Sequence, residues 1–110
     1  PDGGDLACTP AELKSMPKSI VEDVGWAANK CKNEGKATTE CAVATFKAEF
    51  PAKLTDGCIG CVAEFDYCVL EKCKAACDAE DETACNGCVT SQCTPKLNAC
   101  GIVAADRSSG

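Results

Sequence analysis

The sequence predicts an all-α domain of four to five short helices, arranged in antiparallel hairpins that disulfide bonds hold together. Twelve of its 110 residues are cysteine, a share typical of small disulfide scaffolds. In several segments apolar residues recur three and four positions apart, as on one face of a helix. No segment alternates apolar and polar residues as a half-buried strand does. Helices this short are marginal alone, so covalent bonds would supply stability that a small core lacks.

The first predicted helix begins just after Cys8. Thr9 is a good N-cap, Pro10 suits the first helical position, and Glu12 completes a capping box. Pro17 is expected to end this helix after about two turns and to begin another.

The second predicted helix covers residues 18–33. Ile20, Val24 and Ala27 recur at helical spacing. Cys31 continues that stripe, so we expect its sulfur to be buried. Gly35 can adopt the left-handed conformation with which many helices end.

Thr38 and Thr39 predict the start of a third helix, and Pro51 its end. Two apolar sides indicate that this helix lies between two neighbours or against a partner. One side carries Cys41, Ala44 and Ala48, and the other carries Val43, Phe46 and Phe50.

Thr55 is the predicted N-cap of a helix over residues 57–77. Its cysteines share one broad face with apolar residues, and charged residues and a tyrosine lie opposite. The cysteine face carries Cys58, Cys61, Val62, Phe65, Cys68, Val69, Cys73 and Ala76, with Cys77 at its edge; Glu64, Tyr67, Glu71 and Lys74 lie opposite.

The last predicted helix begins at about Ala84, with Thr83 as its cap, after an acidic loop over residues 78–82. This loop lacks the spacing of a calcium-binding loop, which favours a solvated turn. Pro95 is expected to break or kink the helix, and Cys100 and Gly101 to close it.

We expect one domain over residues 1–110. Residues 1–56 form its N-terminal helices, residues 57–101 form a duplicated hairpin, and residues 102–110 form a loose tail. The duplication is indicated by the pattern C-x-G-C-V, which begins at Cys58 and again at Cys85.

Structural disulfides are the favoured role of the cysteines, because an even number of cysteines in a small domain is typical of an oxidising compartment. Twelve cysteines allow roughly ten thousand pairings. We expect those in residues 58–77 to pair largely with those in residues 85–100. The expected disulfide cysteines are Cys8, Cys31, Cys41, Cys58, Cys61, Cys68, Cys73, Cys77, Cys85, Cys88, Cys93 and Cys100.

Two alternative roles remain for the C-x-x-C pairs at Cys58 and Cys85. Together they approximate a four-cysteine zinc pattern, but the chain has eight other cysteines, three of them between the two pairs, so we predict neither a metal nor another cofactor. A C-x-x-C pair at a helix N-terminus can also exchange disulfides, because the helix dipole lowers the thiol pKa. Such enzymes use an α/β fold, which this sequence does not predict.

Composition excludes several function classes. The chain has no histidine, which removes histidine-based acid–base and nucleophilic catalysis, and no acid–base pair is recognisable, so we predict no catalytic residues and no enzyme activity. Its net charge is −6 and its one arginine is Arg107, which argues against nucleic-acid binding. No apolar run approaches the roughly 20 residues that a membrane-spanning helix needs. Because the chain begins at Pro1, we expect a targeting segment before it.

Four aromatic residues are candidate interface anchors, namely Trp26, Phe46, Phe50 and Tyr67. Trp26 falls on the polar side of its helix, and Tyr67 lies opposite the cysteines. The alternative is that Trp26 and Tyr67 pack on a neighbouring helix.

The C-terminal unit has the pattern Cys85-x2-Cys88-x4-Cys93-Thr-Pro95-x4-Cys100-Gly101. It resembles a unit of cysteine-rich proteins from unicellular algae and other protists, over about the last half of the chain. The resemblance implies a secreted or lumenal protein. Together with the composition, this leads us to expect a non-catalytic protein that docks onto a larger complex. The specific expectation is a thylakoid-lumen accessory subunit of an algal photosystem, a membrane-embedded complex. The alternatives are a secreted, pheromone-like signalling or defence protein, and a thiol–disulfide exchange protein.

Overall fold

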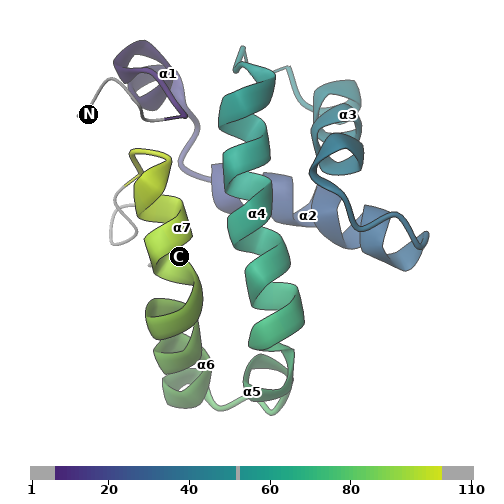
Figure 1. The fold of residues 1–110 in the computed structure, drawn as a ribbon, viewed down its shortest axis with the longest axis vertical. Helices are drawn as coiled ribbons and strands as arrows, with labels where there is room; N and C mark the ends of the chain where they lie inside the picture. Colours follow the sequence, from purple (N-terminus) through teal and green to yellow (C-terminus); the bar gives the residue numbers. More distant parts are fainter. Residues whose placement is uncertain (1–6, 52, 103–110) are drawn as a thin grey trace.

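A computed structural model describes residues 7–51 and 53–102, and every regular element in them is helical (Figure 1). The all-α prediction is therefore confirmed for this part of the chain. Arg107 and residues 103–110 of the predicted tail lie outside it, whereas Ile102 is buried. The elements are α1 (Pro10–Ser15), α2 (Ile20–Asn33), α3 (Thr39–Glu49), α4 (Asp56–Lys72), α5 (Lys74–Asp78), α6 (Glu82–Cys88), the π-helical turn η2 (Val89–Cys93) and α7 (Thr94–Ala99).

Helix α4 runs through the middle of the molecule (Figure 1). It packs against α2 and α3 on one side and against η2 and α7 on the other. Its apolar residues therefore cover two faces instead of the one that we predicted. The second face includes Ile59, Ala63 and Tyr67, all buried. The core lies on both sides of this helix.

Three of the four predicted threonine caps are present. The hydroxyls of Thr9, Thr38 and Thr55 each accept a hydrogen bond from the backbone N–H three residues on. The fourth prediction is wrong, because α6 is capped by Asp81 and not by Thr83. Asp81 Oδ1 accepts from the N–H of Ala84 at 3.1 Å, and the chain turns just before it at Glu80, whose φ is 61°.

The predicted buried stripe of α2 is confirmed, since Ile20, Val24, Ala27 and Cys31 are all buried. The two-sided burial expected for α3 is not found among residues 7–51 and 53–102. Its buried residues are Ala42 and Phe46, whereas Ala44 and Ala48 are exposed. One of the two sides is therefore uncovered by the described residues.

The twelve cysteines form six disulfides, and the described chain has no free thiol. Four of the bonds join α4 and α5 to the hairpin partner formed by α6, η2 and α7, as predicted. The other two are Cys31–Cys41, which joins α2 to α3, and Cys8–Cys58, which joins the N-terminal segment to α4. The four hairpin bonds are Cys77–Cys85, Cys73–Cys88, Cys68–Cys93 and Cys61–Cys100.

Each arm of the hairpin has a helical irregularity at the same level. Cys68 and Cys73 are five residues apart on one arm, and so are their partners Cys93 and Cys88 on the other. Residues five apart on a regular α-helix point about 140° away from each other. The π-helical turn η2 realigns Cys88 and Cys93, while α4 ends at Cys73, whose φ is −115°. The predicted helix over residues 57–77 is therefore two helices.

Candidate interaction surfaces

The C-x-x-C cysteines are held in separate bonds. Cys58 is bonded to Cys8 and Cys61 to Cys100, so neither pairs with its neighbour in the motif. In the second motif, Cys85 and Cys88 are bonded to two further cysteines of the α4–α5 arm. A C-x-x-C exchange centre works by forming and breaking a disulfide between its own two cysteines. The geometry here is that of cross-links between elements.

The four candidate aromatic residues divide into two surface and two buried positions. Phe46 is fully buried and Tyr67 is only 7% exposed, so neither presents a surface to a partner, which corrects our expectation for them. Tyr67 is buried because α4 is central and turns that face toward α3. Its hydroxyl donates to the carbonyl of Thr38 at 2.8 Å and so ties α4 to the start of α3.

Trp26 and Phe50 form an aromatic patch on the surface. Trp26 is 45% exposed and is the only exposed large hydrophobic side chain in the described part of the chain. Its ring meets Phe50 edge-on, with centroids 5.9 Å apart, and Phe50 stacks on Phe46 at 5.0 Å. The patch is thus connected to the core through Phe46, which fixes the orientation of the exposed ring. A shallow cavity of about 320 Å³ adjoins Phe50 and Pro51.

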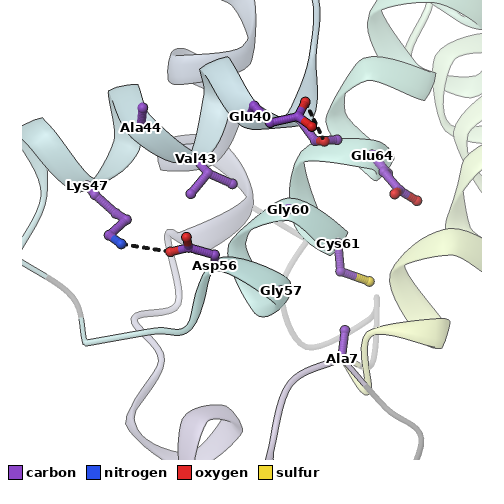
Figure 2. Close-up of a pocket in the computed structure, with 11 residues that line it drawn as sticks. Ala7, Glu40, Val43, Ala44, Lys47, Asp56, Gly57, Gly60, Cys61 and Glu64 are labelled. Carbon is purple, nitrogen blue, oxygen red and sulfur yellow. Dashed lines mark hydrogen bonds and ion pairs between the residues drawn. The ribbon is translucent and has the colours of Figure 1, made fainter.

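An open groove of about 840 Å³ lies between α3 and the start of α4 (Figure 2). Gly57 and Gly60, one turn apart on α4, leave its floor low. A Cβ atom at Gly57 would meet nothing within 4 Å, and one at Gly60 would lie 3.7 Å from Val43 Cγ2. The α3–α4 groove is lined by Ala7, Thr39, Glu40, Val43, Ala44, Lys47, Asp56, Gly57, Gly60, Cys61 and Glu64.

The charges of the α3–α4 groove differ between its two ends. At one end, Lys47 Nζ lies 2.7 Å from Asp56 Oδ1, and this ion pair is neutral overall. At the other end stand Glu40 and Glu64 (Figure 2), neither of which forms an ion pair with the residues that the structure describes. Glu40 only accepts a long hydrogen bond, 3.5 Å, from the Thr39 hydroxyl. The groove therefore has an apolar floor and one acidic end.

Two carboxyl groups lie inside the fold, in opposite environments. Glu12 accepts hydrogen bonds from the N–H of Thr9 at 2.8 Å and from that of Thr55 at 2.6 Å, which joins the starts of α1 and α4. Desolvation opposes ionisation of Glu12, but these backbone hydrogen bonds outweigh it and lower its pKa. Asp66 has an Oδ2 atom with no hydrogen-bond partner. Burial, and next the charge of Glu22, raise the pKa of Asp66 well above its ordinary value.

Asp66 faces α2 and not a cavity. A Cβ atom at Gly25 would lie only 3.2 Å from Asp66 Oδ1, so a glycine on α2 makes room for the carboxyl group. Asp66 lines neither of the cavities described above, and the acid whose charge acts on it is Glu22 of α2. A buried carboxyl group with a shifted pKa makes the stability of the fold depend on pH.

Comparisons with known proteins give no match to the chain, whether by family model, curated protein or solved structure. Within residues 7–51 and 53–102, no three His, Cys, Asp or Glu side chains are grouped so that they could hold a metal ion. No helix in the same two ranges is long and apolar enough to cross a membrane.

Sequence reasoning missed the groove, although it noted Glu64. The available signal was the pair Gly57 and Gly60 within a segment that otherwise favours a helix. Glycine costs up to about 1 kcal/mol relative to alanine inside a helix, so two glycines one turn apart indicate a place where the helix surface is left low and another group can approach the backbone. Ala44, on α3 opposite these glycines, is exposed, but the sequence places it on an apolar side of its helix and so predicts that it is buried.

Proposed function

We propose that this chain is a non-catalytic docking module, which works in an oxidising compartment and attaches to a larger protein assembly through Trp26 and Phe50. The observation that carries the proposal is the aromatic patch, in which an exposed tryptophan is held by Phe50 against the core. Tryptophan is enriched among the residues that contribute most to binding at protein interfaces. A ring that is already fixed loses little entropy on binding.

The six disulfides support the same proposal. They cross-link the N-terminal segment, both arms of the hairpin and the α2–α3 pair. A scaffold of this kind persists in secreted or lumenal compartments, where thiols are oxidised. It presents its surface in one conformation, as a structural subunit of an assembly requires.

The specific assembly that we propose is an algal photosystem, with the chain as an accessory subunit on its thylakoid-lumen side. This rests on the resemblance of residues 85–101 to cysteine-rich proteins of algae and other protists. The test is isolation of the protein in native form from its source. Migration with a chlorophyll-containing membrane complex supports the proposal, and free protein in the surrounding medium would overturn it in favour of a secreted signalling or defence protein.

The role of the aromatic patch is tested in the isolated assembly. We expect Trp26→Ala to release the protein from the complex under conditions that retain the native chain. Lys96→Ala, an exposed change on α7 away from the patch, is the matched control and is expected to leave attachment unchanged. Equal retention of both variants would contradict docking through Trp26.

A further inference from the structure

We infer that the α3–α4 groove is a second binding surface and that it takes a basic amphipathic helix of a partner protein. It lies on α3 and the start of α4, and none of its lining residues belongs to the aromatic patch. The inference therefore does not depend on which assembly Trp26 contacts.

The floor of the groove suits a helix. Helices α3 and α4 form its walls. Gly57 and Gly60 carry no side chain, so the backbone of a partner helix can approach α4 closely. The exposed Ala44 and half-buried Val43 of α3 supply apolar contacts across from them. An amphipathic helix buries its apolar side in such a groove through residues three and four positions apart.

The charges of the groove determine which charge a partner helix must carry. Glu40 and Glu64 both lie at one end, and neither forms an ion pair with a residue that the structure describes, whereas Lys47 at the other end is paired with Asp56. An acidic helix would be repelled at the Glu40–Glu64 end, and the net charge of −6 adds to that repulsion. A helix with lysine or arginine at one end would place its charge between the two glutamates. Complementary charge of this kind sets both the choice of partner and its direction.

Binding can be measured with a synthetic helical peptide as the probe. One version carries a leucine and alanine face with lysines at one end, and its matched version carries glutamates in place of those lysines. We expect the lysine peptide to bind about tenfold more tightly at low salt, because two rim pairs of ordinary surface strength give a ratio of about that size. Added salt should reduce the ratio. Glu40→Gln combined with Glu64→Gln should remove most of it.

Filling the groove tests its location. Gly57→Phe places a ring in the open space above α4 and is expected to lower the affinity for the lysine peptide at least tenfold. Gly87→Phe is the matched control, because Gly87 is also a helical glycine whose Cβ would meet nothing within 4 Å, on α6 and outside the groove. Thermal unfolding and a count of free thiols verify that both variants are folded.

The outcomes separate this inference from the proposed function. Trp26→Ala should bind the lysine peptide normally, whether or not it docks onto an assembly. Equal affinity for the two peptides, or undiminished binding by Gly57→Phe, would overturn the inference. Self-association of the chain that Gly57→Phe abolishes would overturn it as well, by assigning the groove to a second copy.

Discussion

Asp66 is a single carboxyl group buried on the central helix and facing the backbone of α2 at Gly25. The sequence does not predict that Asp66 is buried. It lies between the apolar Phe65 and the more polar Tyr67, and an aspartate in a helix is usually exposed. It is buried because α4 has neighbours on both sides. The position of one residue here depends on the arrangement of whole helices.

The ionisation of Asp66 has a predictable sign. Because its folded pKa is raised, the folded protein binds this proton more tightly than the unfolded chain. The resulting stability is present below the unfolded pKa of about 3.9 and is lost as pH rises through the folded pKa. We therefore expect Asp66→Asn to raise the free energy of unfolding near pH 8 by about 1–3 kcal/mol, because a neutral amide removes the cost of protonating or burying the carboxylate, about 1.4 kcal/mol per pKa unit. Denaturant unfolding with the disulfides intact measures it.

The gain from Asp66→Asn should shrink toward pH 3, where the native carboxyl is neutral. Glu12→Gln is the contrasting control, because the folded pKa of Glu12 is lowered and its contribution is present at neutral pH and lost on acidification. Glu12→Gln should therefore destabilise the protein near pH 7 and converge with the native chain in acid. A loss of stability near pH 8 on Asp66→Asn would contradict our reading of Asp66.

At the scale of the helices, local signals predicted the starts well. Thr9, Thr38 and Thr55 cap as expected, since an N-cap hydrogen bond involves only residues within one turn. The cap of α6 was missed because Asp81 and Thr83 are both acceptable and the choice follows from the turn at Glu80. The two-sided burial of α4 was also missed. Neighbouring helices determine which faces of α4 are buried, and the apolar pattern within α4 does not show where those neighbours lie.

The steps between cysteines predict which helical irregularities are required. Steps of three, four and seven residues return to nearly the same face of an α-helix, whereas the five-residue step from Cys88 to Cys93 does not. Deletion of the exposed Thr90 shortens that step to four, which a regular α-helix accommodates in place of η2. We expect this variant to refold with all six disulfides, as judged by the absence of free thiols in mass spectrometry.

Deletion of Asn98 is the matched control, because it is also exposed but lies in the seven-residue step from Cys93 to Cys100. It turns Cys100 about 100° away from Cys61. We expect that variant to leave two thiols unpaired or to form mixed pairings. Complete pairing after deletion of Asn98, with failure after deletion of Thr90, would show that the irregular turn is required for another reason.

Over the whole molecule, one disulfide joins the N-terminal half to the hairpin. Cys31–Cys41 lies within that half, and Cys8–Cys58 is the bond that reaches α4. The backbone adds a hydrogen bond from the N–H of Cys8 to the carbonyl of Cys100 at 3.3 Å. An oxidising environment and the general pairing between residues 58–77 and 85–100 could be predicted from composition and spacing. The partner of Cys58 could not, because Cys8 lies far away in sequence and its bond depends on the docking of α1.

The disulfides should differ in their effect on stability according to the number of residues in the loop that each one closes. Cys8–Cys58 spans 50 residues and Cys77–Cys85 spans 8. Constraint of the unfolded chain then contributes about 4 kcal/mol for the first bond and about 2.5 kcal/mol for the second. We expect Cys8→Ala with Cys58→Ala to lower the unfolding free energy more than Cys77→Ala with Cys85→Ala does. Denaturant unfolding of the two variants compares them, and the reverse order would mean that the hairpin end stabilises more through its native contacts.

The hairpin bonds also have an order in which they can form. Their sequence separations rise from 8 through 15 and 25 to 39, each bond enclosing the one before it. The first closes a short loop at little entropic cost, and every later bond then brings together ends that are already held near each other. The four bonds can therefore form one after another, from Cys77–Cys85 at the acidic turn to Cys61–Cys100 at the end of α7. The chain reaches one pairing out of roughly ten thousand by a succession of local closures, with only Cys8 left to find a distant partner.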